Sequence, residues 1–358
     1  MANTNKQKRD KYFYISFLNV LSTVSVVVLH SNGAFWDYRN DINWILNNMV
    51  ECVFYFAVPI FFMLVGVNLL DYTDKYDTKT FFKKRVTKTV VPFLIWSIFA
   101  MLLKILQSPR YFIQNEIAFD KIFNGIFNTE YMFIYWFFIP LFCIYLSVPL
   151  LAHIEKKNKN RIFTYIAATA FVVNIFIPFS VKFINIFFGT QIKWIFEIPV
   201  LGGYAFYVIL GYLLHNNDLS RKIRIIIYTA SVLGLLIHFF TTYYLSFKIG
   251  RVDDTLKGYN QLPGVLYSSG IFLLVKQLSS KIKSDKFKNI IFRFQKYTFP
   301  IYLMHWFIYI YLSRILETIN IHRDSQIFVI LITLISVPVC IGITFVLRKI
   351  PVVRNIVP

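Results

Sequence analysis

The sequence predicts an all-α membrane protein, a bundle of about ten transmembrane helices with both termini in the cytoplasm. Hydrophobic residues make up 57% of the 358 residues, against roughly 45–50% apolar residues in soluble domains. The mean hydropathy is +0.56. The apolar residues gather in runs of roughly 20, the length at which a helix crosses about 30 Å of hydrocarbon. These runs are continuous rather than alternating, which disfavours membrane strands.

Ten runs are candidate spans, and we expect residues 1–358 to form a single integral membrane domain around them. The basic segment before the first run resembles the start of a signal peptide. No small-residue cleavage site follows it, so we interpret the run as a retained first span. The expected spans are approximately 12–31, 50–70, 89–106, 131–153, 161–180, 198–215, 223–246, 263–279, 297–317 and 326–347.

The distribution of charge tests this count independently. With a cytoplasmic N-terminus, the inner loops and tails hold 27 of the 38 Lys and Arg residues. Acidic residues divide the other way, so nearly all of the net charge of +20 lies on the inner face. This follows the positive-inside rule, and a wrong number of spans would scramble the alternation. We expect localisation in the cell membrane, with the lipid bilayer as a partner.

Other classes of protein are not favoured by the composition. The positive charge follows the topology, so we expect no nucleic-acid partner. Cys52, Cys143 and Cys340 fall in separate apolar runs. We interpret them as small core residues and expect neither a metal site nor a disulfide.

A polar stripe follows the first span. Asn19 and His30 are eleven positions apart, so they lie within about 20° of the same helical line. Ser16 and Thr23 lie close to that line. Polar groups inside a membrane are costly, and each is a candidate for function. The alternative interpretation is that the stripe hydrogen-bonds a neighbouring helix.

Histidines mark two candidate positions. His30 ends the stripe, and a neutral imidazole there could take a proton from a hydroxyl. His at a helix end can instead be interfacial or structural. His305 lies inside a later span among aromatic residues, where it is either a second site residue or a hydrogen-bonded core histidine.

A cluster of cations precedes the third span. Lys84, Arg85 and Lys88 fall in the stretch FFKKRVTK, and Arg85 and Lys88 share one helix face. The cluster is either an anchor for anionic lipid headgroups or a site for a phosphate-bearing donor. On the outer side, Glu51, Trp36 and Glu197 lie close to span ends. Carboxylates and aromatics there suit a sugar-binding mouth or an ordinary outer interface.

Six segments in order across the chain resemble the acyltransferase 3 family of integral membrane acyltransferases. The family places an Arg and a catalytic His eleven positions apart in the first span, and here His30 matches while Asn19 stands at the Arg position. The family's Arg-x-x-Arg motif reads Arg85 to Lys88. The segments are LNVLSTVSVVVLH (18–30), VPIFFMLVGVNLL (58–70), FFKKRVTKTVVPFLIWS (81–97), YWFFIPLFCIYLSVPLL (135–151), FYVILGYLLH (206–215) and FPIYLMHWFI (299–308).

The resemblance implies that an acyl group, usually acetyl, moves from cytosolic acyl-CoA to a hydroxyl of a cell-envelope polysaccharide or lipid-linked sugar. It makes His30 the catalytic residue and Arg85, Lys88 and Lys84 the contacts to the donor phosphates. Acyl-CoA is then a co-substrate, and no bound cofactor is expected. His30 would act as a general base or become transiently acylated. The rival hypothesis is a glycan or small-solute transporter, which a ten-span bundle with Pro-broken helices would also suit.

Overall fold

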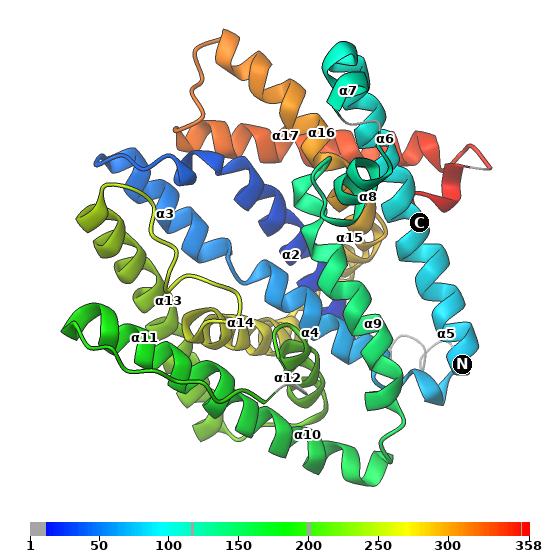
Figure 1. The fold of residues 1–358 in the computed structure, drawn as a ribbon. Coiled ribbons are helices and arrows are strands. Elements are labelled where there is room, and N and C mark those ends of the chain that lie inside the picture. The colour runs from blue at the N-terminus through cyan, green and yellow to red at the C-terminus, as the bar shows by residue number, and fades with distance from the viewer. Residues whose placement is uncertain (1–11, 116–117, 199–201, 352) are drawn as a thin grey trace.

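The computed structural model describes residues 12–115, 118–198, 202–351 and 353–358, which form helices, turns and coil without a strand. The all-α class is therefore confirmed for the described residues. The first helix, α2 (Phe13–Ser31), runs through the middle of the bundle (Figure 1). It packs against helices from both halves of the chain, namely α4 (Ala57–Leu69), α14 (Leu262–Lys281), α15 (Asp285–Gln295), α16 (Thr298–Thr318) and α17 (Gln326–Leu347).

Eight of the described helical segments are long and apolar enough to cross a membrane. Each overlaps one of the expected spans. The expected total of ten spans, with both termini in the cytoplasm, stays a prediction. The eight segments are Phe13–Ser31, Ile42–Asp74, Thr78–Gln107, Phe133–Ala152, Lys156–Phe188, Arg221–Ile249, Thr298–Thr318 and Gln326–Leu347.

The two remaining expected spans correspond to helices that are too short or too polar to be among these eight segments. The run 198–215 is helical only as α12 (Ala205–Asn216), and residues 199–201 lie outside the described residues. The helix begins later than the expected run, directly after a turn in which Gly203 takes a positive φ of 61°. The run 263–279 forms α14, which is 20 residues long but carries four serines and Lys276.

Two long segments are broken near prolines. The segment Ile42–Asp74 divides at Tyr55 into α3 (Ile42–Phe54) and α4, because Pro59 has no backbone N–H to donate to the carbonyl oxygen of Tyr55. A π-helix, Val86–Val90, joins α5 (Thr78–Arg85) to α6 (Val91–Gln107) just ahead of Pro92. Such widened turns often occur at functional sites, and this one begins directly after Arg85.

A second π-helix, Phe171–Phe176, joins α10 (Lys156–Ala170) to α11 (Ile177–Phe188). The longest expected outer loop, residues 107–130, also contains two short helices, α7 (Pro109–Asn115) and α8 (Phe119–Phe127). A 3-10 turn, Phe133–Phe137, leads into α9 (Phe138–Ala152). The long helix α13 (Arg221–Ile249) then runs beside α14.

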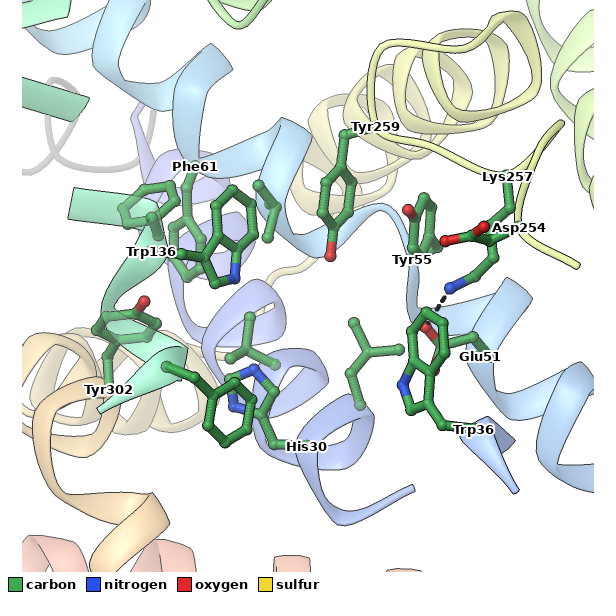
Figure 2. Close-up of a pocket in the computed structure, with 15 residues that line it drawn as sticks. His30, Trp36, Glu51, Tyr55, Phe61, Trp136, Asp254, Lys257, Tyr259 and Tyr302 are labelled. Carbon is green, nitrogen blue, oxygen red and sulfur yellow. Dashed lines mark hydrogen bonds and ion pairs between the residues drawn. The ribbon is translucent and has the colours of Figure 1, made fainter. Parts of the chain in front are cut away.

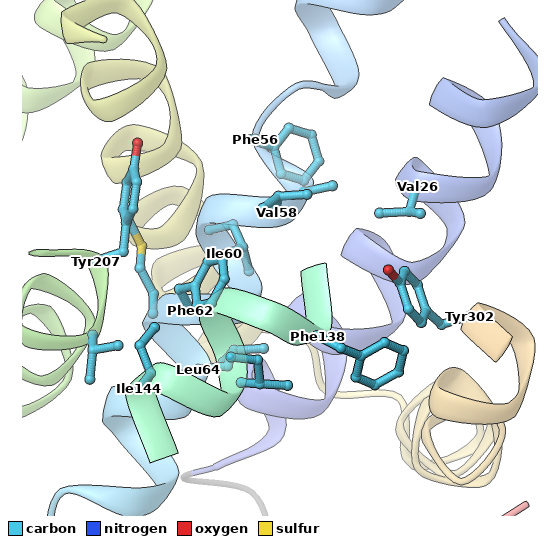
Figure 3. Close-up of a cluster of buried hydrophobic side chains, with 14 of the residues drawn as sticks. Val26, Phe56, Val58, Ile60, Phe62, Leu64, Phe138, Ile144, Tyr207 and Tyr302 are labelled. Atoms are coloured by element: carbon cyan, nitrogen blue, oxygen red, sulfur yellow. The ribbon is translucent and has the colours of Figure 1, made fainter. Parts of the chain in front are cut away.

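The core lies where α2, α4, α9, α12 and α16 meet. Figure 3 shows Val26, Phe62, Phe138, Tyr207 and Tyr302, one side chain from each of these helices. Glycines allow α4 and α12 to touch: a Cβ at Gly66 would lie 1.8 Å from the carbonyl oxygen of Val208. This close approach is typical of membrane helix pairs.

Candidate active site

The two candidate histidines meet in the structure. His30 lies in the last turn of α2, and its Nδ1 is 2.7 Å from Nε2 of His305 in α16. The two rings are parallel to within 6°, with centroids 5.0 Å apart. His305 is 1% exposed, whereas His30 is only partly buried. The packing of α2 against α16 therefore brings together two residues that lie 275 positions apart in the chain.

Hydrogen bonding selects the tautomer of both rings. Nδ1 of His305 lies 2.9 Å from the carbonyl oxygen of Ile301, which can only accept, so Nδ1 carries the proton. In the neutral ring, Nε2 of His305 then accepts from Nδ1 of His30. Nε2 of His30 is left with its lone pair, which suits it to act as a base or a nucleophile.

His30 lines a cavity of about 290 Å³ at the predicted outer end of the bundle. Trp36 and Glu51 line it too, while Glu197 is exposed in the segment after α11 and does not. Figure 2 shows His30 on one side of the cavity and Trp36, Glu51 and Lys257 on another.

A buried ion pair forms part of the cavity wall. Nζ of Lys257 lies 2.8 Å from Oε1 of Glu51, and the two side chains are 3% and 7% exposed. The ammonium group also lies 4.5 Å from the ring centroid of Trp36 and 4.7 Å from that of Tyr55. Such rings stabilise a desolvated cation. Asn32 donates to Oε2 of Glu51 at 3.5 Å.

Aromatic rings continue the wall from the ion pair, in the order Tyr55, Tyr259 and Trp136. Tyr259 stacks on Tyr55 with centroids 4.3 Å apart and on Trp136 with centroids 5.7 Å apart. Burial raises the pKa of the Tyr259 hydroxyl well above its ordinary value, so this group stays protonated and available as a donor. The hydroxyl of Tyr207 donates to the carbonyl oxygen of Tyr259 and holds its loop in place.

The polar stripe of α2 lies further inward. Asn19 and Thr23 line a second cavity of about 200 Å³, which we call the middle cavity, together with Thr89 and Thr298. Asn19 donates to Oγ1 of Thr298 at 3.3 Å, so the stripe both bonds a neighbouring helix and lines a cavity. Ser16 is buried but is not among the residues that line these cavities.

Arg85 lines a third cavity of about 200 Å³, which we call the inner cavity, together with Asn19, Asn68 and Gln295. The guanidinium carbon lies 5.8 Å from the ring centroid of Phe81 and 5.6 Å from that of Tyr145. Its Nε is buried and has no hydrogen-bond partner among the described residues. A planar guanidinium whose Nε–H group has no protein acceptor is suited to bind an anionic group.

The other two cations of the cluster lie elsewhere. Lys84 places Nζ 3.7 Å from the ring centroid of Tyr76, and Lys88 is exposed. Neither is among the residues that line the cavity of Arg85. The three side chains were predicted as one group. Lys84 lies in α5 one residue before Arg85 and therefore points about 100° away around the helix, and Lys88 lies inside the π-helix, whose wider turn changes its direction relative to Arg85.

Sequence reasoning missed Lys257, Tyr259 and Tyr302, which all line the outer cavity. The available signal was the outer segment RVDDTLKGYNQL, in which a lysine and two aspartates stand between two apolar runs. Tyr302 carried no signal, because its span is rich in aromatic residues throughout.

Comparison with known proteins gives one match. Residues 12–345 match a family model, acyltransferase 3, described as an acyltransferase domain. No curated protein and no solved structure matches the chain. Because the family model covers nearly all of the chain, the protein belongs to the acyltransferase 3 family of integral membrane acyltransferases.

Proposed function

We propose that this acyltransferase moves an acetyl group from cytosolic acetyl-CoA to a hydroxyl of a cell-envelope polysaccharide or lipid-linked sugar. The observation that carries the proposal is the His30–His305 pair, which leaves a lone pair on Nε2 of His30, a residue that lines the outer cavity. The protein would act in the cell membrane, with donor and acceptor approaching from opposite faces.

The donor site is proposed around Arg85. Its buried Nε has no protein partner among the described residues, and charge-assisted bonds to phosphate would satisfy the guanidinium. Lys84 and Lys88 would add positive charge near the entrance rather than direct contacts. Asn19, in the place of the family's arginine, would supply a neutral amide along the donor's path instead of a second charge.

Two balanced routes follow from a basic His30 Nε2. In the first, the acceptor hydroxyl oxygen attacks the acyl carbon, the C–S bond breaks, and the hydroxyl proton passes through Nε2 to the thiolate. In the second, Nε2 itself attacks the acyl carbon and the thiolate leaves. The acceptor hydroxyl oxygen then attacks the same carbon, the bond from that carbon to Nε2 breaks, and the hydroxyl proton passes to the freed Nε2 and on to the thiolate. In both routes His305 keeps the His30 ring in the required tautomer.

The acceptor site is proposed in the outer cavity. The carboxylate of Glu51, the ammonium of Lys257 and the phenol of Tyr259 offer the donors and acceptors that sugar hydroxyls need. Trp36 and Trp136 offer flat apolar faces beside them. Glu197 lies outside this cavity, so we do not include it in the acceptor site.

The test is mass spectrometry of surface glycans from cells that make the wild-type protein or His30→Ala. We expect one acetyl mass shift with the wild type and its loss with His30→Ala, since removal of a general base costs roughly 10²–10⁴-fold in rate. His322→Ala is the matched control, because His322 is exposed and distant in sequence from both histidines. Full modification by His30→Ala would refute the catalytic role. Glycans moved without any mass shift would favour the transporter.

A further inference from the structure

The three cavities meet at the same aromatic side chains. Phe61 of α4 and Phe137 line the outer, the middle and the inner cavity. Tyr302 of α16 lines the outer and the middle cavity. We call these three residues the aromatic septum. In Figure 2, Phe61 and Tyr302 lie on the side of the outer cavity away from Glu51 and Lys257.

The rings of the septum touch one another. The centroids of Phe61 and Phe137 are 5.8 Å apart, with the ring planes at 59°. The centroids of Phe137 and Tyr302 are also 5.8 Å apart, at 64°. These separations and angles are those of favourable aromatic pairs. The contacts therefore separate the cavity of His30 from the cavity of Arg85 in this conformation.

Only part of the septum is held by hydrogen bonds. The Tyr302 hydroxyl donates to the carbonyl oxygen of Ile134, and the Tyr135 hydroxyl donates to that of Leu303 at 2.7 Å. These reciprocal bonds tie the turn Phe133–Phe137 to α16. The side chains of Phe61 and Phe137 have no polar atom, but Phe137 lies in the turn that these bonds hold, and its ring also packs on Phe62, Phe138 and Tyr302. The ring of Phe61 packs on Phe137 and is only partly buried. Phe61 is thus the member that a passing group can displace at the lowest cost.

We infer that the aromatic septum sets the length of the acyl group that the enzyme transfers, with Phe61 as the main specificity-determining residue. The inference rests on the proposed function, in which the donor phosphates bind at Arg85 and the acyl carbon must reach His30. An acetyl group needs little displacement of the rings. Each added methylene must enlarge the opening further, and overpacking a closely packed site is costly.

The experiment uses the full-length protein in inverted membrane vesicles from the producing cells, which carry the native acceptors. Radiolabelled acetyl-CoA, butyryl-CoA and hexanoyl-CoA are added to the outside of the vesicles, and the label in the glycan and lipid-linked fractions is measured. Wild type is compared with Phe61→Leu and Phe61→Ala. Phe183→Leu is the matched control, since Phe183 is likewise partly buried but packs on Phe179 and Phe187 of α11 and lines none of the three cavities.

We expect wild type to prefer acetyl over butyryl by at least about 10-fold, the discrimination that a single pocket achieves for small changes in chain length. Phe61→Leu and Phe61→Ala should lower that preference progressively, by about 10-fold for alanine. Phe183→Leu should keep the wild-type preference. Phe61→Leu removes little volume, so it keeps the test informative if Phe61→Ala is poorly inserted.

Two failures are distinguishable. If wild type transfers acetyl but the Phe61 variants keep its chain-length preference, the septum is not the selector and the proposed function stands. Equal transfer of all three acyl groups by wild type would overturn the inference in the same way. If wild type transfers none of them, as expected for His30→Ala, the proposed function fails and the inference falls with it.

Discussion

At the scale of single residues, the most informative contact is the bond between His30 and His305. His305 donates a hydrogen bond from Nδ1 to the Ile301 carbonyl oxygen and accepts one at Nε2 from Nδ1 of His30, so it acts as a positioning residue. The direction of these two hydrogen bonds decides which nitrogen of His30 is basic. A second residue-scale feature is Arg85, whose Nε is buried without a partner among the described residues.

Replacing His305 should reduce turnover without weakening donor binding. We expect His305→Ala to lower kcat by about 10²-fold, because Nδ1 of His30 loses its acceptor and the ring its orientation. The KM for acetyl-CoA should stay the same. His305→Gln offers a carbonyl oxygen to His30 Nδ1 and should recover part of the rate. A raised KM with kcat unchanged in either variant would argue against a positioning role.

Replacing Arg85 should weaken donor binding instead. Loss of one charge-assisted hydrogen bond costs about 1.5–3 kcal/mol, so Arg85→Ala should raise the KM for acetyl-CoA by roughly 10–100-fold. Lys83→Ala is the control, since it removes an exposed positive charge two residues away. Steady-state kinetics in inverted vesicles separates the two parameters. Equal effects of both variants would indicate that Arg85 only contributes to the surface charge.

At the scale of elements, prolines and glycines determine where the helices change direction and how closely they pack. Pro59 divides the second span so that Tyr55 reaches the outer cavity, and the π-helix Val86–Val90 sends Arg85 and Lys88 in different directions. Gly66 and Gly211 remove side-chain bulk where α4 crosses α12. Phe61 lies on the same helix as Gly66, so this crossing also positions the septum.

A side chain at the crossing should destabilise the bundle. A Cβ at Gly66 would lie 1.8 Å from a backbone oxygen and one at Gly211 would lie 2.2 Å from another, and neither backbone segment can yield cheaply. We expect Gly66→Ala and Gly211→Ala to cost about 1–3 kcal/mol each and to lower the Tm in detergent. Gly342→Ala is the control, because no atom lies within 4 Å of its added Cβ. An unchanged Tm for Gly66→Ala would contradict the crossing.

At the scale of the whole molecule, the bundle connects two sites at opposite ends of α2. The outer, middle and inner cavities follow one another through shared lining residues, from Lys257 and His30 to Arg85. Transfer across the bilayer requires these ends to face different compartments. The topology is therefore the property of the whole chain on which the proposed function depends.

Single cysteines in a cysteine-free background test that topology. We expect Lys193→Cys to react with a membrane-impermeant maleimide from outside the cell, and Asp218→Cys to react only after the cells are opened. Both positions are exposed, and they flank the short helix α12. Labelling of both from the same side would show that the segment containing α12 does not cross the membrane and would reduce the number of spans.

Much of this molecule follows from local sequence. Eight of the ten expected spans correspond to long apolar helices, because a continuous run of apolar side chains has no other stable form in hydrocarbon. Trp36, Glu51 and Glu197 were predicted on the outer side from their places near span ends; Trp36 and Glu51 line the outer cavity with His30, and Glu197 does not. The helix α12 begins later than the expected run, since hydropathy does not register the positive φ of Gly203.

The sequence by itself determined the helical class and the polar stripe of the first span, since each depends on periodicity and composition within one span. The expected roles of His30 and Arg85 came instead from the resemblance to the family. Only the tertiary structure decided that His305 orients His30, that Lys257 pairs with Glu51, and that Phe61, Phe137 and Tyr302 divide the cavities. These contacts join positions up to 275 residues apart. They arise from how the helices cross, which no pattern within a single helix encodes.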